Sequence, residues 1–418
     1  MSGVSGTPRV RAVRASAART SCTAVGFRSP PVYLDWGRCS RRVVPTAPHT
    51  ATRGPVIALP RARALLATFA AAGLLLSGCA ANEPGVDADY DGPSGRFNAS
   101  GSSAQEAAQA AWISGYQEAY PGVTINYSPV GSGAGRANFV EGWTVYAGSD
   151  AALDEDEGPL VSCADGATAL NLPVYISPIA VIFNVEGVDD LRLDPDTMAA
   201  VFNGTIGTWN DPAIAALNPE AALPDAPITV VHRSDDSGTT ENFTEYLHDT
   251  APDVWTEEPS DTYAYRFAGA DGNQGNSGVV EGVRNGRNTI GYADASRAGG
   301  LSSAQILVEG EWVSFSDEAA AAAVAASPFA ERADEHDLVI ELDRTGPAGS
   351  YPLVLVSYMV VCSEYRDARD AAFLTDYASW VASEEGQARS AESAGSAPLA
   401  EATAERVRAA VRSIGADG

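Results

Sequence analysis

Hydrophobic positions follow two alternating patterns from about residue 97 onward. Short runs rich in β-branched and aromatic residues predict strands, and apolar residues three or four apart predict helices. The predicted strands are Val123–Tyr127, Val174–Asn184, Ile228–His232, Leu338–Leu342 and Leu353–Val361. The predicted helices are Ala104–Tyr120, Asn242–Leu247, Asp317–Ala326 and Phe373–Val381. Strands that alternate with helices are typical of an α/β protein.

Two apolar runs, Leu172–Val185 and Pro352–Cys362, are longer than the others. We interpret them as strands that cross between two lobes, which a chain of 418 residues is long enough to form. The predicted lobe I comprises residues 97–177 and 349–418, and the predicted lobe II comprises residues 178–348. No internal repeat is evident.

The segment Ala64–Leu76 is an uninterrupted apolar run that follows Arg61 and Arg63. Its 13 residues are too few for a helix that crosses a bilayer core of about 30 Å, so we interpret it as the apolar part of a secretory signal. A buried helix is the alternative. The polar tract Ala80–Gly101 that follows is typical of a flexible tether.

The sequence Leu76-Ser77-Gly78-Cys79 resembles a bacterial lipobox, in which the cysteine becomes the lipid-modified first residue. We therefore expect residues 1–78 to be a pre-segment and lipoprotein signal, and residues 79–96 to be a tether. Residues 1–55 are rich in arginine and follow no period, so Val56 is a candidate for the functional start.

The expected removal of the signal determines which of the five cysteines remain in the mature protein. Cys22 and Cys39 fall in the removed segment and Cys79 takes the lipid, which leaves Cys163 and Cys362. Two thiols in an exported domain predict one disulfide, with two separate buried thiols as the alternative. No CxxC or HExxH pattern occurs, and we expect no metal site and no cofactor.

Charge is distributed unevenly along a chain whose net charge is −27. Residues 1–78 carry 11 arginines and one acidic residue, Asp35, whereas the remainder carries 16 arginines against 53 acidic residues. The electrostatic field of so acidic a segment does not attract nucleic acid or an anionic membrane. The sequence contains no lysine, which excludes a P-loop.

Three serine-containing turns precede predicted helices. The turns are Gly101-Ser102-Ser103-Ala104-Gln105, Gly131-Ser132-Gly133-Ala134-Gly135 and Arg233-Ser234-Asp235-Asp236-Ser237-Gly238-Thr239. Each places hydroxyls and small residues where a helix leaves its first N–H groups without partners, a favourable position for an anion. A serine that merely caps its helix is the ordinary alternative for any one of them.

Two of these turns directly follow predicted strands, where ligands bind at the carboxyl edge of an α/β sheet. Arg233 lies four residues before Ser237, so one loop offers both a guanidinium fork and a helix terminus to a tetrahedral oxyanion. Asp150 also belongs to this set, unless it only caps the following segment. A carboxylate beside a bound anion is costly unless the ligand carries a proton, which hydrogen phosphate does and sulfate does not.

In these motifs the chain resembles the PstS-type phosphate-binding lipoproteins of phosphate ABC importers, from about Asn98 to the C-terminus. Besides the three turns, the matching segments are Ala147-Gly148-Ser149-Asp150, Val201-Phe202-Asn203-Gly204, Thr208-Trp209-Asn210-Asp211-Pro212 and Ser350-Tyr351-Pro352-Leu353. The resemblance implies a periplasmic-binding-protein-like fold, with two α/β lobes that two strands join and that close over one phosphate.

Carried over by position, the resemblance implies a set of phosphate contacts made by side chains and backbone N–H groups. The implied contacts are Ser103, Ala104, Ser132, Asp150, Arg233, Ser237, Gly238 and Thr239. Asp235 is expected to orient Arg233. Ser103-Ala104 departs from the Thr-Phe of many relatives, which puts an aromatic wall of the site in doubt, and a contribution from Ser102 stays open.

The implied function is that of a monomeric binding protein rather than an enzyme. It is expected to be lipid-anchored at Cys79 on the outer face of the bacterial cell membrane and to deliver phosphate to permease subunits of an ABC transporter, without binding nucleic acid. A binder of sulfate or molybdate is one alternative, and a secreted phosphatase is another. A phosphatase needs an activated nucleophile or a metal, and His232, His248 and His336 have no ligand-like spacing.

Overall fold

A computed structural model describes residues 93–155 and 157–416. The predicted signal and lipobox, and nearly all of the predicted tether, lie outside these residues. The tether predicted for residues 79–96 extends two residues too far, because strand β1 (Gly95–Gly101) already begins at Gly95. The end of the polar tract Ala80–Gly101 is therefore a strand and not a flexible segment. The backbone N–H of Gly95 donates to the carbonyl of Gly122, which ties the start of this strand to the chain ahead of β2 (Val123–Ser128).

One mixed sheet organises the described part of the chain, with the strand order β2-β1-β3-β11-β4-β8-β6-β7. The remaining strands of this order are β3 (Tyr146–Ser149), β4 (Ala169–Asn184), β6 (Thr229–Arg233), β7 (Ala270–Asn273), β8 (Thr289–Asp294) and β11 (Val354–Cys362). Strands β5 (Leu191–Leu193), β9 (Ser302–Val308) and β10 (Glu311–Val313) join through β9, which pairs with β4. Strands β12 (Glu364–Tyr365) and β13 (Gly415–Ala416) form a separate pair.

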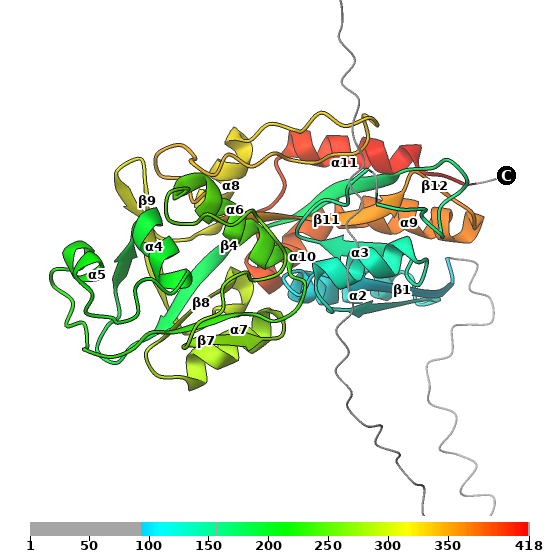
Figure 1. Ribbon diagram of the computed structural model, residues 1–418. Coiled ribbons are helices and arrows are strands. Elements are labelled where there is room, and N and C mark those ends of the chain that lie inside the picture. Colours follow the sequence, from blue (N-terminus) through cyan, green and yellow to red (C-terminus); the bar gives the residue numbers. More distant parts are fainter. Residues whose placement is uncertain (1–92, 156, 417–418) are drawn as a thin grey trace, which may run out of the picture. The chain divides into compact units, whose positions relative to one another are not determined.

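Strand β4 connects the two halves of this sheet. Its residues 169–178 pair with β11, whereas residues 179–184 pair with β8. Figure 1 shows β4 running from the β11 side of the molecule to the β8 side. We call the part built on β1, β2, β3 and β11 lobe I, and the part built on β6, β7 and β8 lobe II. The residue boundaries predicted for the lobes stay a prediction.

The return from lobe II to lobe I runs just ahead of β11. Within the part of the chain that the structure describes, strand β11 pairs only with β3 and with residues 169–178 of β4. Before it, the carbonyl of Leu353 accepts from Ile179, and the hydroxyl of Tyr351 donates to the carbonyl of Ile179 at 3.0 Å. The predicted run Pro352–Cys362 therefore contains the second connection at its beginning.

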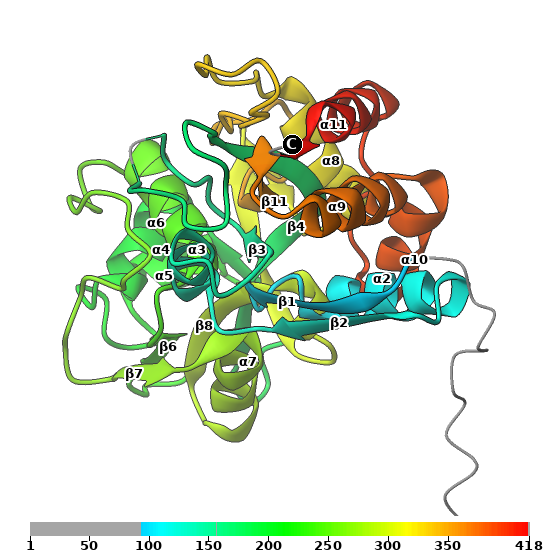
Figure 2. The same cartoon turned by 90° about the vertical axis from the view of Figure 1, so that its right-hand side faces the viewer.

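Helices cover both faces of the sheet. The lobe I helices are α2 (Glu106–Ala119), α3 (Ser132–Val140), α9 (Ala368–Val381), α10 (Glu384–Ala394) and α11 (Glu401–Ser413). The other helices are α4 (Pro195–Phe202), α5 (Pro212–Leu217), α6 (Gly238–Thr250), α7 (Gly275–Asn285), α8 (Asp317–Ala326) and the short 3-10 helix η1 (Ala295–Arg297). In Figure 2, α2, α9 and α10 lie on one side of the lobe I strands and α3 lies on the other.

The predicted strand Leu338–Leu342 is wrong. This segment makes a single bridge, between Ile340 and Phe329, and the hydroxyl of Tyr358 accepts from the backbone N–H of Ile340. Leu338 and Ile340 are buried, whereas Val339 and Leu342 are only partly buried. The backbone of the segment bonds Asn171 of β4 and residues 328 and 330 instead of pairing as a strand of the sheet. The other predicted strands and helices are confirmed, with shifts at their ends.

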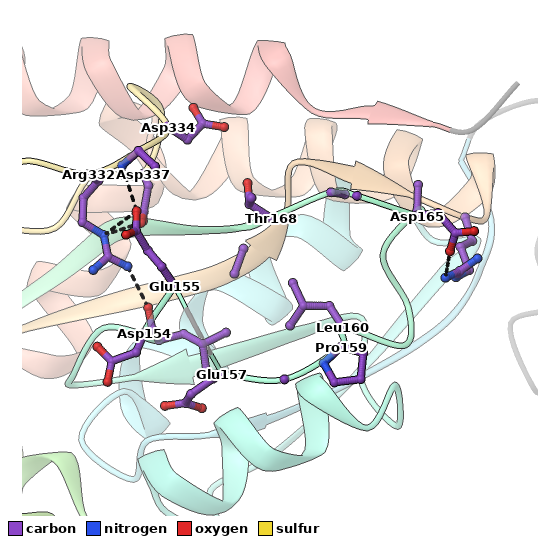
Figure 3. A pocket seen from close by; sticks show the side chains of 18 residues that line it. Asp154, Glu155, Glu157, Pro159, Leu160, Asp165, Thr168, Arg332, Asp334 and Asp337 are labelled. Atoms are coloured by element: carbon purple, nitrogen blue, oxygen red, sulfur yellow. Dashed lines mark hydrogen bonds and ion pairs between the residues drawn. The ribbon is translucent and has the colours of Figure 1, made fainter. Parts of the chain in front are cut away.

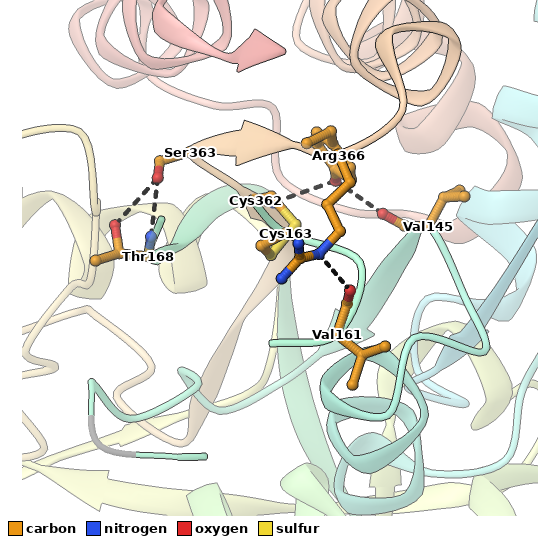
Figure 4. The surroundings of a disulfide bond; sticks show 8 residues. Val145, Val161, Cys163, Thr168, Cys362, Ser363 and Arg366 are labelled. Carbon is orange, nitrogen blue, oxygen red and sulfur yellow. Dashed lines mark hydrogen bonds between the residues drawn. A yellow bond between two sulfur atoms is a disulfide. The ribbon is translucent and has the colours of Figure 1, made fainter. Parts of the chain in front are cut away.

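The predicted disulfide is present between Cys163 and Cys362, whose Cα atoms are 5.4 Å apart. Cys362 ends β11, and Cys163 precedes β4 (Figure 4). Next to it, the hydroxyl of Tyr365 accepts from the backbone N–H of Cys362 and donates to the carbonyl of Val145. The bond therefore fastens one end of lobe I. None of the helices in the described residues has the length and apolar character that a bilayer crossing needs.

Candidate functional site

The turn after β1 brings Ser103 against lobe II. Gly101 has φ +147° and lies so close to β3 that a Cβ would stand 1.9 Å from the carbonyl oxygen of Gly148, so only glycine fits. The Oγ of Ser102 accepts from the backbone N–H groups of Ala104 and Gln105 in the turn ahead of α2. Ser103 instead reaches across to α7, where its Oγ accepts from the backbone N–H and the Nδ2 of Asn276.

The turn after β2 places Ser132 at the first position of α3. Its Oγ accepts from the backbone N–H of Asp150 at 3.1 Å, which fixes the end of β3 beside the start of α3. A hydroxyl that accepts in this way keeps its single hydrogen for a second acceptor. Ser132 is 1% exposed, so that acceptor has to lie inside the protein.

The turn after β6 supplies most of the lobe II groups. Ser237 is the N-cap of α6, and its Oγ accepts from the backbone N–H of Thr240 at 3.2 Å. Gly238 begins the helix against lobe I, where a Cβ would meet Ser132 Oγ and Asp150 Cβ at 2.7 Å each. The backbone N–H groups at the start of α6 therefore approach lobe I more closely than a larger residue would permit.

Arg233 ends β6 and is 2% exposed. Its Nε donates to Asp235 Oδ1 at 2.8 Å and its Nη2 donates to Asp235 Oδ2 at 2.5 Å, which is the fork geometry that fixes a guanidinium plane. The remaining terminal nitrogen, Nη1, faces Thr239 Oγ1 at 3.4 Å. These two bonds are the contacts expected if Asp235 orients Arg233, a role that stays a prediction.

Asp150 lies at the centre of these groups. Its Oδ1 accepts from the hydroxyl of Ser357 on β11 at 2.6 Å, and its Oδ2 accepts from Thr239 Oγ1 of lobe II at 3.1 Å. The side chain amide of Asn242 donates to the Asp150 carbonyl at 2.7 Å. A carboxylate that is 3% exposed is thereby held by hydroxyl donors from both lobes.

The pKa values of the acidic groups at and near the site are shifted in different directions. Burial raises the pKa of Asp150, although hydrogen bonds from Ser102, Ser357 and Thr239 and the charge of Arg233 oppose this shift. Burial also raises the pKa of Asp294 to about 6, with Asp150 as a further repulsive charge. For Asp235 burial acts in the same sense, but the hydrogen bonds and charge of Arg233 outweigh it and lower the pKa.

The predicted residues thus meet at one place between the lobes. Direct contacts, or contacts through Asn276, join most of them: Ser103, Ser132, Asp150, Arg233, Gly238 and Thr239. Ser237 caps the helix that begins with Gly238. The backbone N–H of Ala104 lies at the same place, where Ser102 Oγ accepts from it at 3.0 Å. Position 104 holds a fully buried alanine in place of an aromatic ring.

Two residues of this network, Asn276 and Ser357, were not predicted from the sequence. Asn276 bridges the lobes, because its Nδ2 donates to both Ser103 Oγ and Thr239 Oγ1. It lies at the start of α7 after β7, the same strand-turn-helix arrangement that pointed to the other turns, so a signal was available. Ser357 lies inside β11, 207 residues from Asp150, where no local pattern distinguishes it.

A separate cavity of about 370 Å³ in lobe I is a poorer candidate for an anion site. Asp154, Glu155, Glu157, Asp165, Asp334 and Asp337 line it together with Arg332 and Arg366 (Figure 3). Arg332 is already engaged by Asp337, with Nε to Oδ2 at 2.6 Å. The remaining carboxylates would repel an anion, and no group of acidic, histidine or cysteine side chains in the described residues is arranged to hold a metal ion.

Comparison with known proteins gives one consistent result. The family model described as "PBP superfamily domain" matches residues 81–385. The chain is 36% identical over 316 residues to the phosphate-binding protein PstS 3 of Mycobacterium leprae, covering 72% of this chain and 85% of that protein. It is also 36% identical over 326 residues to the phosphate-binding protein PstS 2 of Mycobacterium tuberculosis, covering 74% and 87%.

Solved structures resemble this fold at lower sequence identity. A high affinity periplasmic phosphate-binding protein, PfluDING, bound with phosphate, aligns with a TM-score of 0.64 at 24% identity, over 75% of this chain and 93% of that one. A phosphate binding protein from Stenotrophomonas maltophilia aligns with a TM-score of 0.57 at 18% identity, over 76% and 94%. At these identities the likeness establishes the periplasmic-binding-protein-like fold.

Proposed function

The chain belongs to the PstS family of phosphate-binding proteins, and on that premise we propose that it captures inorganic phosphate between its lobes for an ABC importer. The observation that carries the proposal is the placement of Asp150, a buried acceptor among hydroxyl and N–H donors of both lobes. Hydrogen phosphate is an anion that needs many donors and also brings a proton for one acceptor.

The donor groups are suited to the phosphate oxygens. The hydroxyls of Ser103, Ser132 and Ser237 each accept a hydrogen bond from an N–H group of the protein, so their own hydrogens are left to donate. Arg233 adds a guanidinium whose plane Asp235 fixes, and the N-terminus of α6 adds backbone donors and a favourable dipole.

Asp150 is the group that separates phosphate from sulfate and molybdate in this proposal. Its carboxylate accepts the proton of hydrogen phosphate, whereas a fully deprotonated oxyanion would face it with another negative oxygen in a buried site. The raised pKa of Asp150 belongs to the same burial, since a carboxylate with little solvent favours a partner that brings a proton. A phosphatase is not favoured, because the Oγ atoms of Ser103, Ser132 and Ser237 accept from N–H groups, and no bond found in the described residues joins one of these hydroxyls to a general base.

We also propose that Cys79 carries the lipid that anchors the protein to the outer face of the cell membrane. The support is the sequence Leu76-Ser77-Gly78-Cys79 behind an apolar run of 13 residues. Replacing Cys79 by alanine should release the protein into the medium, with Cys22→Ala as the control. Expression of the chain from Val56 onward tests the start site, since loss of export would contradict it.

Phosphate capture is tested by calorimetry on the purified chain after its bound phosphate has been removed by exhaustive dialysis. Titration with phosphate, sulfate and molybdate in separate runs should give one phosphate site per chain and no heat from the other two. Equal binding of all three would identify a general oxyanion binder. Release of inorganic phosphate from phosphomonoesters would identify a phosphatase.

A further inference from the structure

Helices α3 and α6 face each other across the boundary between the lobes. At the ligand end, Ser132 of α3 lies against Gly238 of α6, with 2.7 Å between Ser132 Oγ and a Cβ built on Gly238. One turn further along, Arg136 of α3 faces Glu241 of α6, with Nη1 and Oε2 3.8 Å apart. Residues three or four apart lie on the same helix face, so each helix presents one small and one charged residue to the other lobe.

Arg136 makes its contacts in both lobes. Within lobe I its Nη1 donates to Ser149 Oγ at 3.2 Å, and its Nε lies 3.9 Å from Glu157 Oε1. In lobe II it approaches Glu241, and its Nη2 donates to Asp261 Oδ2 at 3.4 Å. Its side chain is 12% exposed, so these charges interact with little screening by water.

Around Arg136 the boundary between the lobes is acidic. Asp154 and Glu157 come from lobe I, and Glu241, Glu245 and Asp261 come from lobe II. Arg344 is the second arginine nearby, but Glu245 and Asn242 already engage its Nη2 at 2.5 and 2.6 Å. Closing the lobes therefore brings carboxylates of like charge together, and Arg136 is the cation that lies between them.

Glu241 is an acid of this boundary with little compensation for its charge. A third of its side chain is exposed, yet its Oε2, on the side of Arg136, is buried and has no hydrogen-bond partner. Burial raises the pKa of Glu241 to about 7; the charge of Arg136 lowers it, and Asp261, Glu245 and Asp154 raise it again. An ionised Glu241 thus opposes closure even with Arg136 present.

We propose that Arg136 sets the affinity for phosphate without touching it, by neutralising the carboxylates that meet when α3 and α6 close. The proposal rests on the proposed phosphate binding. It differs from a simple ion-pair contribution in one respect: removing the cation weakens the closed form, whereas removing the charge of Glu241 strengthens it. Arg136 is linked to the site because it donates to Ser149, which precedes Asp150. Glu241 is linked to it because it precedes Asn242, which donates to the carbonyl of Asp150.

The test is a double-mutant cycle with Arg136→Gln and Glu241→Gln, read out by phosphate affinity and dissociation rate at pH 7.5. Arg136→Gln should weaken binding by about 10- to 100-fold, mostly through faster dissociation, because it leaves buried carboxylates without their cation. Glu241→Gln should tighten binding by about tenfold. This is well below the roughly 300-fold that the whole rise of the pKa from 4.5 to about 7 would represent, because a third of the Glu241 side chain stays exposed to water. In the double variant, the loss caused by Arg136→Gln should be smaller.

Arg389→Gln is the matched control, because it removes the same charge from ion pairs with Glu118 and Glu385 that stay within lobe I. Phosphate binding by the parent but equal affinity in Arg136→Gln and Arg389→Gln would overturn the inference. So would a loss in Glu241→Gln as large as that in Arg136→Gln. If Arg136→Gln does not fold, the tightening in Glu241→Gln decides alone. Absence of phosphate binding in the parent would instead contradict the proposed function.

Discussion

Thr239 and Asp150 meet across the lobe boundary, with Thr239 Oγ1 donating to Asp150 Oδ2 at 3.1 Å. The same Oγ1 accepts from Asn276 Nδ2 and faces Arg233 Nη1. One hydroxyl thus links the acceptor of lobe I to the donors of lobe II. Because the bond joins residues of the two lobes, we expect opening of the lobes to break it and to expose the Asp150 carboxylate to solvent. The environment of Asp150 therefore depends on closure.

Replacing Arg233 by lysine should weaken phosphate binding although the charge is kept. Asp235 holds the guanidinium plane through two parallel hydrogen bonds, and an ammonium group cannot reproduce that fork. Losing a hydrogen bond to a charged group costs about 1.5 to 3 kcal/mol, so the affinity should fall roughly 10- to 150-fold. Calorimetry measures the change, with Arg408→Lys as a control within lobe I; an unchanged affinity would mean that Arg233 does not touch the ligand.

Removing the disulfide should destabilise the protein without changing its affinity for phosphate. The bond closes a segment of 199 residues, and the chain-entropy model then gives about 5 kcal/mol of stabilisation at most. Both cysteines lie in lobe I, so closure is not affected. Urea denaturation of Cys163→Ala/Cys362→Ala should show a lower free energy of unfolding, whereas a weaker phosphate affinity in the folded variant would contradict this placement.

Phosphate affinity should depend on pH through Glu241. Burial holds the pKa of this carboxyl at about 7 in this structure, against 4.5 for a free carboxyl. We expect opening the lobes to return the pKa toward 4.5, so that closure takes up a proton. The resulting favourable contribution is complete below pH 4.5 and is lost as the pH rises through 7. Phosphate itself titrates in this range, so the quantity to follow is the affinity of Glu241→Gln divided by that of the parent.

This ratio should be near one at pH 4.5, rise toward pH 7 and level off above it, at constant ionic strength. The exposed Glu186 provides the control variant, Glu186→Gln, whose ratio should stay flat. A flat ratio for Glu241→Gln as well would show that Glu241 keeps its ordinary pKa in the closed form.

Local sequence patterns were sufficient to predict the position of a residue where that position follows from its neighbours in the sequence. Ser132 and Ser237 stand at strand-turn-helix junctions, so their placement at helix starts could be read from the sequence. Ser357 and Arg136 could not be found in this way, because a serine within a strand and an arginine on a helix are common. Their roles come from the packing of β11 and α6 against other elements. The strand predicted for Leu338–Leu342 was wrong for a related reason, since a short run rich in β-branched and apolar residues also occurs in a segment that makes only an isolated bridge.

The central claim is that Asp150 accepts the proton of phosphate and thereby excludes sulfate. Asp150→Asn keeps the shape of the side chain and replaces one acceptor oxygen by a donor amide. A buried polar group without its partner can discriminate between ligands by about 10⁴ to 10⁵, so the parent should not measurably bind sulfate. Asp165→Asn, at a carboxylate whose side chain is 91% exposed, controls for the loss of charge.

The decisive measurement is competition by sulfate against radiolabelled phosphate in the parent, in Asp165→Asn and in Asp150→Asn. Sulfate should displace phosphate measurably only from Asp150→Asn, while phosphate binding survives there because the amide can present either its oxygen or its nitrogen. If Asp150→Asn excludes sulfate as completely as the parent, the selectivity lies in other residues and the role assigned to Asp150 is wrong.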